Sequence, residues 1–247
     1  MSDSTSKARI NLFEFTKCNK CLYNNAPYQS ICGNCKAYLR EKIVNIDLWI
    51  TIQKLIESPY EAFRSIVFAE HKNFIFFLLF FISIKNLIIA RFISVPELGK
   101  EGVITSLSVL LFFSLLITIG FVVIISFIQS IIFQKLNIKL RTIDVIALNS
   151  YSQIPLIFSL ILIFPVELIV LGSDIFSNNP YAFQIKPTIT YILLSIEAIM
   201  ILWSFILYFF SIHFVGIKKI YCFISTILVF VIWASILYLS SKVIFRL

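Results

Sequence analysis

Five long apolar runs occupy most of the chain from residue 74 to residue 245, and they constrain the fold more than any other feature. The runs cover, approximately, residues 74–93, 103–133, 154–171, 188–215 and 220–244. A helix needs roughly 20 apolar residues to cross the hydrocarbon core of a bilayer. The composition agrees, because 59% of the residues are hydrophobic and only 14% are charged, whereas soluble domains carry roughly 25% charged residues. The sequence therefore predicts an all-α integral membrane bundle of five transmembrane helices.

The positive charges predict how these spans are oriented. Of the 21 lysines and arginines, fifteen lie before the first span or in the second and fourth connections, and five lie in the alternate segments. Cytoplasmic loops of membrane proteins carry the excess of Lys and Arg. We therefore expect a multi-pass membrane protein with its N-terminus in the cytosol and its C-terminus outside. The formal net charge of +8 also suits an anionic lipid surface.

Four of the five cysteines form two C-x2-C pairs near the N-terminus. Cys18 and Cys21 make the first pair, and Cys32 and Cys35 make the second after ten intervening residues. Two such turns can aim four thiolates at one point, as tetrahedral Zn²⁺ requires, whereas a redox pair needs only one C-x2-C. We expect a structural zinc ribbon over residues 17–40, in a reducing compartment. A flexible tail is expected over residues 1–16.

Residues 41–73 are predicted to link the ribbon to the first span through interfacial helices. From residue 43 to residue 56 the chain is amphipathic, with a few polar residues among the apolar ones, and Trp49 is one of the apolar residues. Such an amphipathic helix could lie in the bilayer interface or pack against the ribbon, and both interpretations stay open. Ser58, Pro59 and Glu61 then match a capping box with proline at the first helical position. This pattern predicts a short in-plane helix, or simply the start of the first span.

The connection over residues 136–153 carries a second helical pattern. Thr142 is the expected N-cap of this helix, which we interpret as interfacial and cytosolic; a packed loop is the alternative. In the span that follows, Pro155 and Pro165 predict kinks, because proline breaks the hydrogen-bond ladder of a membrane helix.

Three charged residues fall inside the predicted spans: Lys85, Glu167 and Glu197. Charge is costly in the hydrocarbon, so such residues are functional candidates. At 1.5 Å per residue, Lys85 lies ~17 Å from the inner end of its span and Glu197 ~15 Å from the outer end of its own. Lys85 could therefore pair with Glu197 or with Glu167, holding the bundle together or lining a polar path. The alternative is that Lys85 and Glu167 extend toward the outer surface.

Motifs of the common enzyme classes are missing from the sequence. We find no GxSxG, no HExxH and no glycine-rich phosphate loop, and the chain holds only six glycines. We therefore expect no enzymatic activity. Nucleic-acid binding by the basic ribbon is not favoured either, because anionic lipid explains lysines beside a membrane equally well.

Two resemblances extend this interpretation. The N-terminal module resembles the short zinc-ribbon head of many bacterial membrane and regulatory proteins, although Leu22 and Lys36 stand where its turns usually have glycine. Its other matching positions, beside the four cysteines, are Asn25, Pro27, Gly33 and Leu39. The order of features from residue 57 to residue 245 resembles the Yip family of Ypt/Rab-interacting membrane proteins. The positions that carry this second resemblance are Ser58, Pro59, Phe63, Tyr151 and Pro155.

The Yip resemblance implies a five-span helical bundle with a cytosolic N-terminus, and the zinc-ribbon head, typical of the family's bacterial form, implies a bacterial cytoplasmic membrane. Eukaryotic members bind prenylated small GTPases, but their Asp-Leu-Tyr-Gly-Pro motif is absent from this chain. We therefore predict a non-enzymatic membrane scaffold or adaptor, whose zinc ribbon docks a cytosolic protein partner, and we leave homo-oligomers open. The alternative prediction is a transporter of small solutes or ions that uses Lys85, Glu167 and Glu197.

Overall fold

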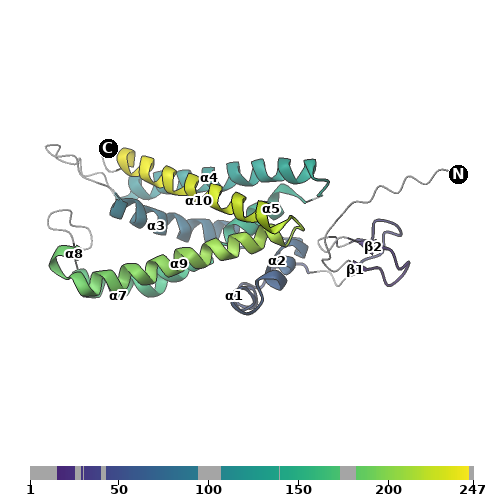
Figure 1. Cartoon of the computed structure of the whole chain (residues 1–247), viewed down its shortest axis with the longest axis horizontal. Helices are drawn as coiled ribbons and strands as arrows, with labels where there is room; N and C mark the ends of the chain where they lie inside the picture. The colour runs from purple at the N-terminus through teal and green to yellow at the C-terminus, as the bar shows by residue number, and fades with distance from the viewer. Residues whose placement is uncertain are drawn as a thin grey trace.

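The computed structural model describes residues 16–25, 29, 31–39, 43–93, 107–138, 140–172 and 182–244. The predicted tail over residues 1–16 lies, apart from its last residue, outside this part of the chain. The structure is mostly helical, with a small cysteine-rich module at its N-terminal side (Figure 1).

Long helices run lengthwise through the main body (Figure 1). They are α3 (Ile75–Ile93), α4 (Leu107–Lys135), α9 (Pro187–His213) and α10 (Lys219–Ile244). A broken helix runs beside α9 and consists of α6 (Ile154–Phe158), a π-helical segment, η1 (Ser159–Ile163), and α7 (Phe164–Leu171), with the short α8 (Ala182–Ile185) before α9. These bounds agree closely with the five apolar runs.

Four segments of the described chain are long and apolar enough to cross a membrane: Ser108–Lys135, Ile154–Leu171, Pro187–His213 and Lys219–Lys242. Large apolar side chains on their outer faces are exposed, among them Ile169 and Leu239. A water-facing surface of this kind would be costly, whereas lipid solvates it. The architecture is therefore that of a multi-pass membrane protein. α3 has 19 residues and carries Lys85, but it is not among the four, so a fifth span stays a prediction.

The broken helix changes its hydrogen-bond pattern just before Pro165, whereas Pro155 lies where the helix begins. Both prolines lie in the first turn of a helical segment, and η1 lies between those segments. Proline has no backbone N–H to donate, so the i→i−4 pattern cannot continue through it unchanged. A π-helical turn shifts the register by one residue, and such turns are frequent at functional sites.

Two short helices precede α3 at the end of the bundle nearest the cysteine module (Figure 1). α1 (Leu48–Glu57) packs against α2 (Pro59–Phe68), and Asp47 caps α1 by accepting a hydrogen bond from the backbone N–H of Ile50 at 3.0 Å. Pro59 begins α2, as predicted. The prediction of a reciprocal capping box is wrong, because the side chain of Ser58 makes no capping hydrogen bond. Oε1 of Glu61 instead lies 3.8 Å from Nη1 of Arg64.

The connection between α4 and α6 forms helix α5 (Thr142–Tyr151). The helix agrees with the sequence pattern, but its N-cap is Arg141 rather than Thr142. Seven of its ten residues are buried against α2, α3, α4 and α9. The structure therefore places α5 inside the end of the bundle and not on its surface. Its burial follows from side chains such as Val145 and Tyr151, which join the same apolar core as Phe63 of α2.

Candidate metal centre and buried ionic sites

The four predicted ligand cysteines lie together. Sγ of Cys18 is 3.5 Å from Sγ of Cys35, Sγ of Cys21 is 3.5 Å from Sγ of Cys32, and all four sulfurs lie within 4.8 Å of one another. With Zn–S bonds of about 2.3 Å, tetrahedral zinc would set its sulfurs about 3.8 Å apart. The cluster could therefore hold a metal ion.

Local backbone structure builds this cluster. Strand β1 (Thr16–Lys17) pairs antiparallel with β2 (Asn24–Asn25), and each C-x2-C turn closes on a backbone hydrogen bond, from Leu22 to Cys18 at 2.8 Å and from Lys36 to Cys32 at 3.2 Å. Leu22 and Lys36 have φ values of 56° and 61°. This is the left-handed region that favours glycine, so both turns form with a non-glycine residue in a conformation that glycine adopts more easily.

Asn25 joins the two turns. The sequence motif includes this residue but did not predict that role. Its side-chain amide donates to the carbonyl of Tyr23 at 2.8 Å, and its side-chain oxygen accepts from the backbone N–H of Gly33 at 2.9 Å. The residue is almost fully buried, so its hydrogen bonds are made in a site that excludes water. Asn25 thereby holds the first turn and the second turn in one orientation.

The thiols of the cluster differ in how readily they ionise. Burial raises the pKa of Cys32, but hydrogen bonds from the backbone of Cys35 and Asn34 outweigh it and lower that pKa to about 6. At Cys35 the backbone of Ala37 lowers the pKa, but hydrogen bonding to the other sulfurs, Cys21 first, prevails and raises it to about 12. The neighbouring sulfurs thus oppose ionisation of Cys35, and a divalent metal ion bound among the four sulfurs would favour its thiolate.

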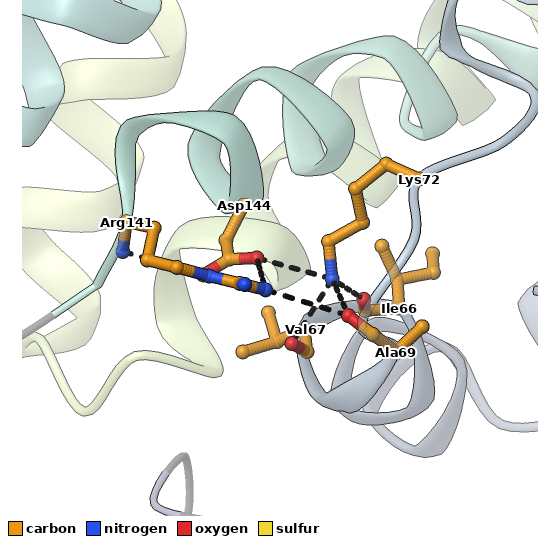
Figure 2. A network of polar contacts seen from close by, with 6 residues as sticks. All are labelled: Ile66, Val67, Ala69, Lys72, Arg141 and Asp144. Atoms are coloured by element: carbon orange, nitrogen blue, oxygen red, sulfur yellow. Dashed lines mark hydrogen bonds and ion pairs between the residues drawn. The ribbon is translucent and has the colours of Figure 1, made fainter. Parts of the chain in front are cut away.

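A second cluster lies where α2 meets α5 (Figure 2). The ammonium group of Lys72 contacts Asp144 Oδ1 at 3.0 Å and donates to the carbonyl oxygens of Val67 at 3.0 Å, of Ala69 at 2.6 Å and of Ile66. These carbonyls end α2, where a helix has unsatisfied acceptors and a partial negative charge. Lys72 therefore neutralises the C-terminus of one helix and a carboxylate of the next.

Arg141 completes this cluster from the other side. Its guanidinium donates to both carboxylate oxygens of Asp144, at 2.8 and 3.0 Å, and Nη2 also reaches the carbonyl of Ala69 at 3.4 Å. Burial lowers the pKa of Lys72 although Asp144 acts in the opposite sense, and hydrogen bonding to Asp144 raises the pKa of Arg141. Sequence reasoning missed this cluster. The available signal was Asp144 itself, the only acidic residue between positions 102 and 166.

The third site lies inside the bundle. Of the two carboxylates that the sequence suggested as partners of Lys85, the structure pairs it with Glu197. Nζ of Lys85 lies 2.7 Å from Oε1 of Glu197. Ser159, the first residue of η1, donates its hydroxyl to the same carboxylate at 2.6 Å. Lys85 and Ser159 are buried and Glu197 is nearly so. The π-helical turn thus supplies a polar group that the sequence pattern had not singled out.

Glu167 is the remaining intramembrane candidate. It is buried, and its Oε2 has no hydrogen-bond partner among the described residues. It lies on α7, eight residues after Ser159 along the same broken helix. Both Glu197 and Lys85 act on it electrostatically. The three predicted intramembrane charges thus belong to one region of the bundle, in which Lys85 and Glu197 pair and Oε2 of Glu167 has no hydrogen-bond partner among the described residues.

Comparisons of the chain with family models, with curated proteins and with solved structures find no match. The interpretation therefore rests on the sequence and on the geometry described above.

Proposed function

We propose that this chain is a non-enzymatic membrane adaptor of the Yip type, in which a zinc ribbon docks a cytosolic protein and a five-span bundle holds it at the membrane. The observation that carries this proposal is the position of the ribbon. It lies beyond one end of the bundle (Figure 1), and Leu22, Tyr23 and Tyr38 expose their side chains on it. Exposed aromatic side chains on a small rigid module are typical of a docking surface.

Zinc is the metal that best suits the cluster. Four thiolates in a closed, four-coordinate arrangement form the usual structural zinc site. The exposed ribbon has few buried apolar side chains of its own, and the metal would supply most of its folding free energy. In this role Cys18, Cys21, Cys32 and Cys35 are ligands and no open position is left for catalysis.

A fifth span is supported by the dimensions and contacts of α3. Its 19 residues correspond to about 29 Å of helix, close to the thickness of the hydrocarbon core. It packs against both α4 and α10, and its charge at Lys85 is buried and paired. Five spans place the ribbon and the C-terminus on opposite sides of the membrane, and in Figure 1 the last turn of α10 lies at the end of the bundle opposite the ribbon. The positive-inside rule then puts the ribbon in the cytosol. We assign the membrane to a bacterium.

We assign α1 to the cytosolic lipid interface. In Figure 1 this helix is viewed nearly end-on while the bundle runs across the view, so its axis lies crosswise to the spans. Trp49, Ile50 and Ile56 are exposed on it. A crosswise amphipathic helix with an outward tryptophan suits the boundary between headgroups and acyl chains.

The test separates zinc binding from docking. The intact chain is crosslinked in native membranes and captured, in parallel with Tyr38→Glu, which changes the exposed face, and with Cys18→Ser/Cys21→Ser, which removes two ligands. We expect a near-stoichiometric partner that both variants lose, although Tyr38→Glu keeps its metal. Glu61→Gln, an exposed change on α2, is the control. A captured set that is the same in all four proteins contradicts the adaptor proposal.

The buried side chain of Glu167, whose Oε2 has no hydrogen-bond partner among the described residues, favours transport as a second candidate function. A buried carboxyl beside an ion pair can take up and release a proton as the pair opens, which is how membrane carriers use such residues. Proton flux would be measured in proteoliposomes under a pH gradient, with Glu167→Gln as the variant and Lys242→Gln, an exposed change, as the control. Loss of flux in Glu167→Gln alone supports transport, and equal flux in all three proteins and in empty liposomes excludes it.

A further inference from the structure

The four sulfurs of the cysteine cluster lie in unequal surroundings. Cys18 and Cys32 are buried, whereas Cys21 and Cys35 are partly exposed. A buried thiolate has no bulk water to donate hydrogen bonds to it, so N–H groups of the protein must do so. The donors around the two buried sulfurs therefore decide how well a metal-bound thiolate is stabilised there.

Backbone N–H groups supply part of these donors. The N–H of Lys20 lies 3.4 Å from Sγ of Cys18, and the backbone of the second turn likewise donates to Cys32. Cys32 has a further donor from outside its own turn. This is the side-chain amide of Asn25 on β2, whose Nδ2 lies 3.6 Å from Sγ of Cys32. A side chain of the first half of the module thus acts on a sulfur of the second half.

The orientation of the Asn25 amide is fixed by its other hydrogen bonds. The backbone N–H of Gly33 can only donate, and it lies 2.9 Å from Oδ1 of Asn25. Nδ2 lies 2.8 Å from the carbonyl oxygen of Tyr23, which can only accept. A flipped amide would lose both bonds, since its oxygen accepts and its nitrogen donates. The Nδ2 end therefore faces the sulfur.

The two hydrogens of Nδ2 have three acceptors within reach. The carbonyl of Tyr23 takes one of them at 2.8 Å, and the other lies between the carbonyl of Thr16 at 3.4 Å and Sγ of Cys32 at 3.6 Å. When a metal is bound, Cys32 is a thiolate, and an ionised acceptor forms the stronger hydrogen bond. In the loaded centre the second hydrogen therefore favours the sulfur.

We propose that Asn25 is a positioning residue of the metal centre, which holds the thiolate of Cys32 in place and withdraws negative charge from it through Nδ2. Residues that support metal ligands in this way typically change metal affinity by roughly 10–100-fold. The inference rests on the metal-binding role proposed for the four cysteines and adds to them a residue that is not a ligand. The alternative is that Asn25 only joins the two turns, through Gly33 and Tyr23.

The test loads the full-length chain, purified in detergent, with Co²⁺ in place of zinc. Cobalt bound to thiolates absorbs by sulfur-to-metal charge transfer. Hydrogen bonds to the sulfurs tune the electronic properties of such centres, and a sulfur that loses a donor holds its electrons less tightly. The energy of the charge-transfer band therefore reports on the contact to Cys32 and not only on the fold of the module.

Asn25→Asp and Asn25→Leu both remove the donor, the first with almost the same shape and the second without adding charge. We expect each variant to bind Co²⁺ about 10–100-fold more weakly in competition with a chelator. At saturating Co²⁺ the charge-transfer band of each should move to longer wavelength. Asn24→Asp is the matched control, because Asn24 is the neighbouring residue on β2 and is exposed. It should match the intact chain in affinity and in band position.

Three results would overturn the proposal. One is an unshifted band at saturation in the Asn25 variants, whatever their affinity, since Asn25 would then join the turns without acting on the sulfur. The second is complete loss of Co²⁺ binding in both, which exceeds the effect of one contact and would make Asn25 a requirement for folding. The third is an equal change in Asn24→Asp. If one Asn25 variant alone retains Co²⁺, its band decides.

Failure of the four-cysteine assignment itself would look different. The intact chain would then show no sulfur-to-cobalt band at all. Failure of the present inference alone leaves the intact chain with a normal band, and Cys18→Ser without one.

Discussion

Lys72 and Asp144 are far apart in the sequence, but Nζ of the first lies 3.0 Å from Oδ1 of the second, and both side chains are buried. Lys72 follows the last turn of α2 and Asp144 lies in the first turn of α5 (Figure 2). The pair therefore joins the helix that precedes the first apolar run to the connection between α4 and α6. It fixes the end of the bundle from which the cysteine-rich module projects.

The first prediction concerns this pair. Asp144→Asn should lower the free energy of unfolding by about 3 kcal/mol, because it leaves a buried ammonium without its countercharge. Lys72→Met should cost less, about 1–2 kcal/mol, since Arg141 still bonds the carboxylate. Unfolding in mixed detergent micelles, followed by far-UV circular dichroism, measures both. Glu61→Gln is the control, because its pair with Arg64 is on the surface and should change stability by less than about 0.5 kcal/mol. Equal stability of Asp144→Asn and the control would contradict the assignment.

The second prediction concerns the pair inside the bundle. Lys85→Met should destabilise the protein by about 3–5 kcal/mol, because Glu197 would keep its charge in the membrane with only Ser159 to bond it. The double variant Lys85→Met/Glu197→Met should recover most of this loss, since no unpaired charge is left. Thermal melting in detergent gives the comparison. If the destabilisation of the double variant equals the sum of those of Lys85→Met and Glu197→Met, the two residues are not coupled.

The third prediction concerns the metal. Purified protein should contain one zinc ion per chain by elemental analysis, and Cys18→Ser should lose it, because three thiolates no longer close the tetrahedral site. Cys222→Ser is the matched control, since this cysteine lies in α10 and outside the cluster. Full zinc content in Cys18→Ser, or its loss in the control, would refute the four-cysteine assignment.

The fourth prediction concerns topology. With five spans, a phosphatase that is active only outside the cytoplasm should be active when fused after residue 244 and inactive when fused within the α4–α5 connection. A fluorescent protein that folds only in the cytosol should give the opposite pattern. With four spans and the same cytosolic N-terminus, the C-terminal fusion would fluoresce. This single pair of fusions therefore decides whether α3 crosses the membrane.

The sequence by itself determined the features that depend on local chemistry. Run length and hydropathy predicted the helices that begin near residues 75, 154, 187 and 219, because a segment of that length and polarity is stable in lipid only as a helix. The spacing of Cys18, Cys21, Cys32 and Cys35 predicted their convergence, since two short turns position all four thiolates. Proline at position 165 marked the interrupted helix.

Tertiary structure decided everything that depends on which distant residues meet. It selected Glu197 rather than Glu167 as the partner of Lys85, added Ser159 through a π-helical turn, and placed α5 inside the bundle instead of on its surface. The interiors of membrane bundles and their lipid-facing sides are similarly apolar, so hydropathy does not distinguish a buried helix face from an exposed one. Lys72 and Asp144 illustrate the same limit, because only packing α2 against α5 makes two separated charges into a pair.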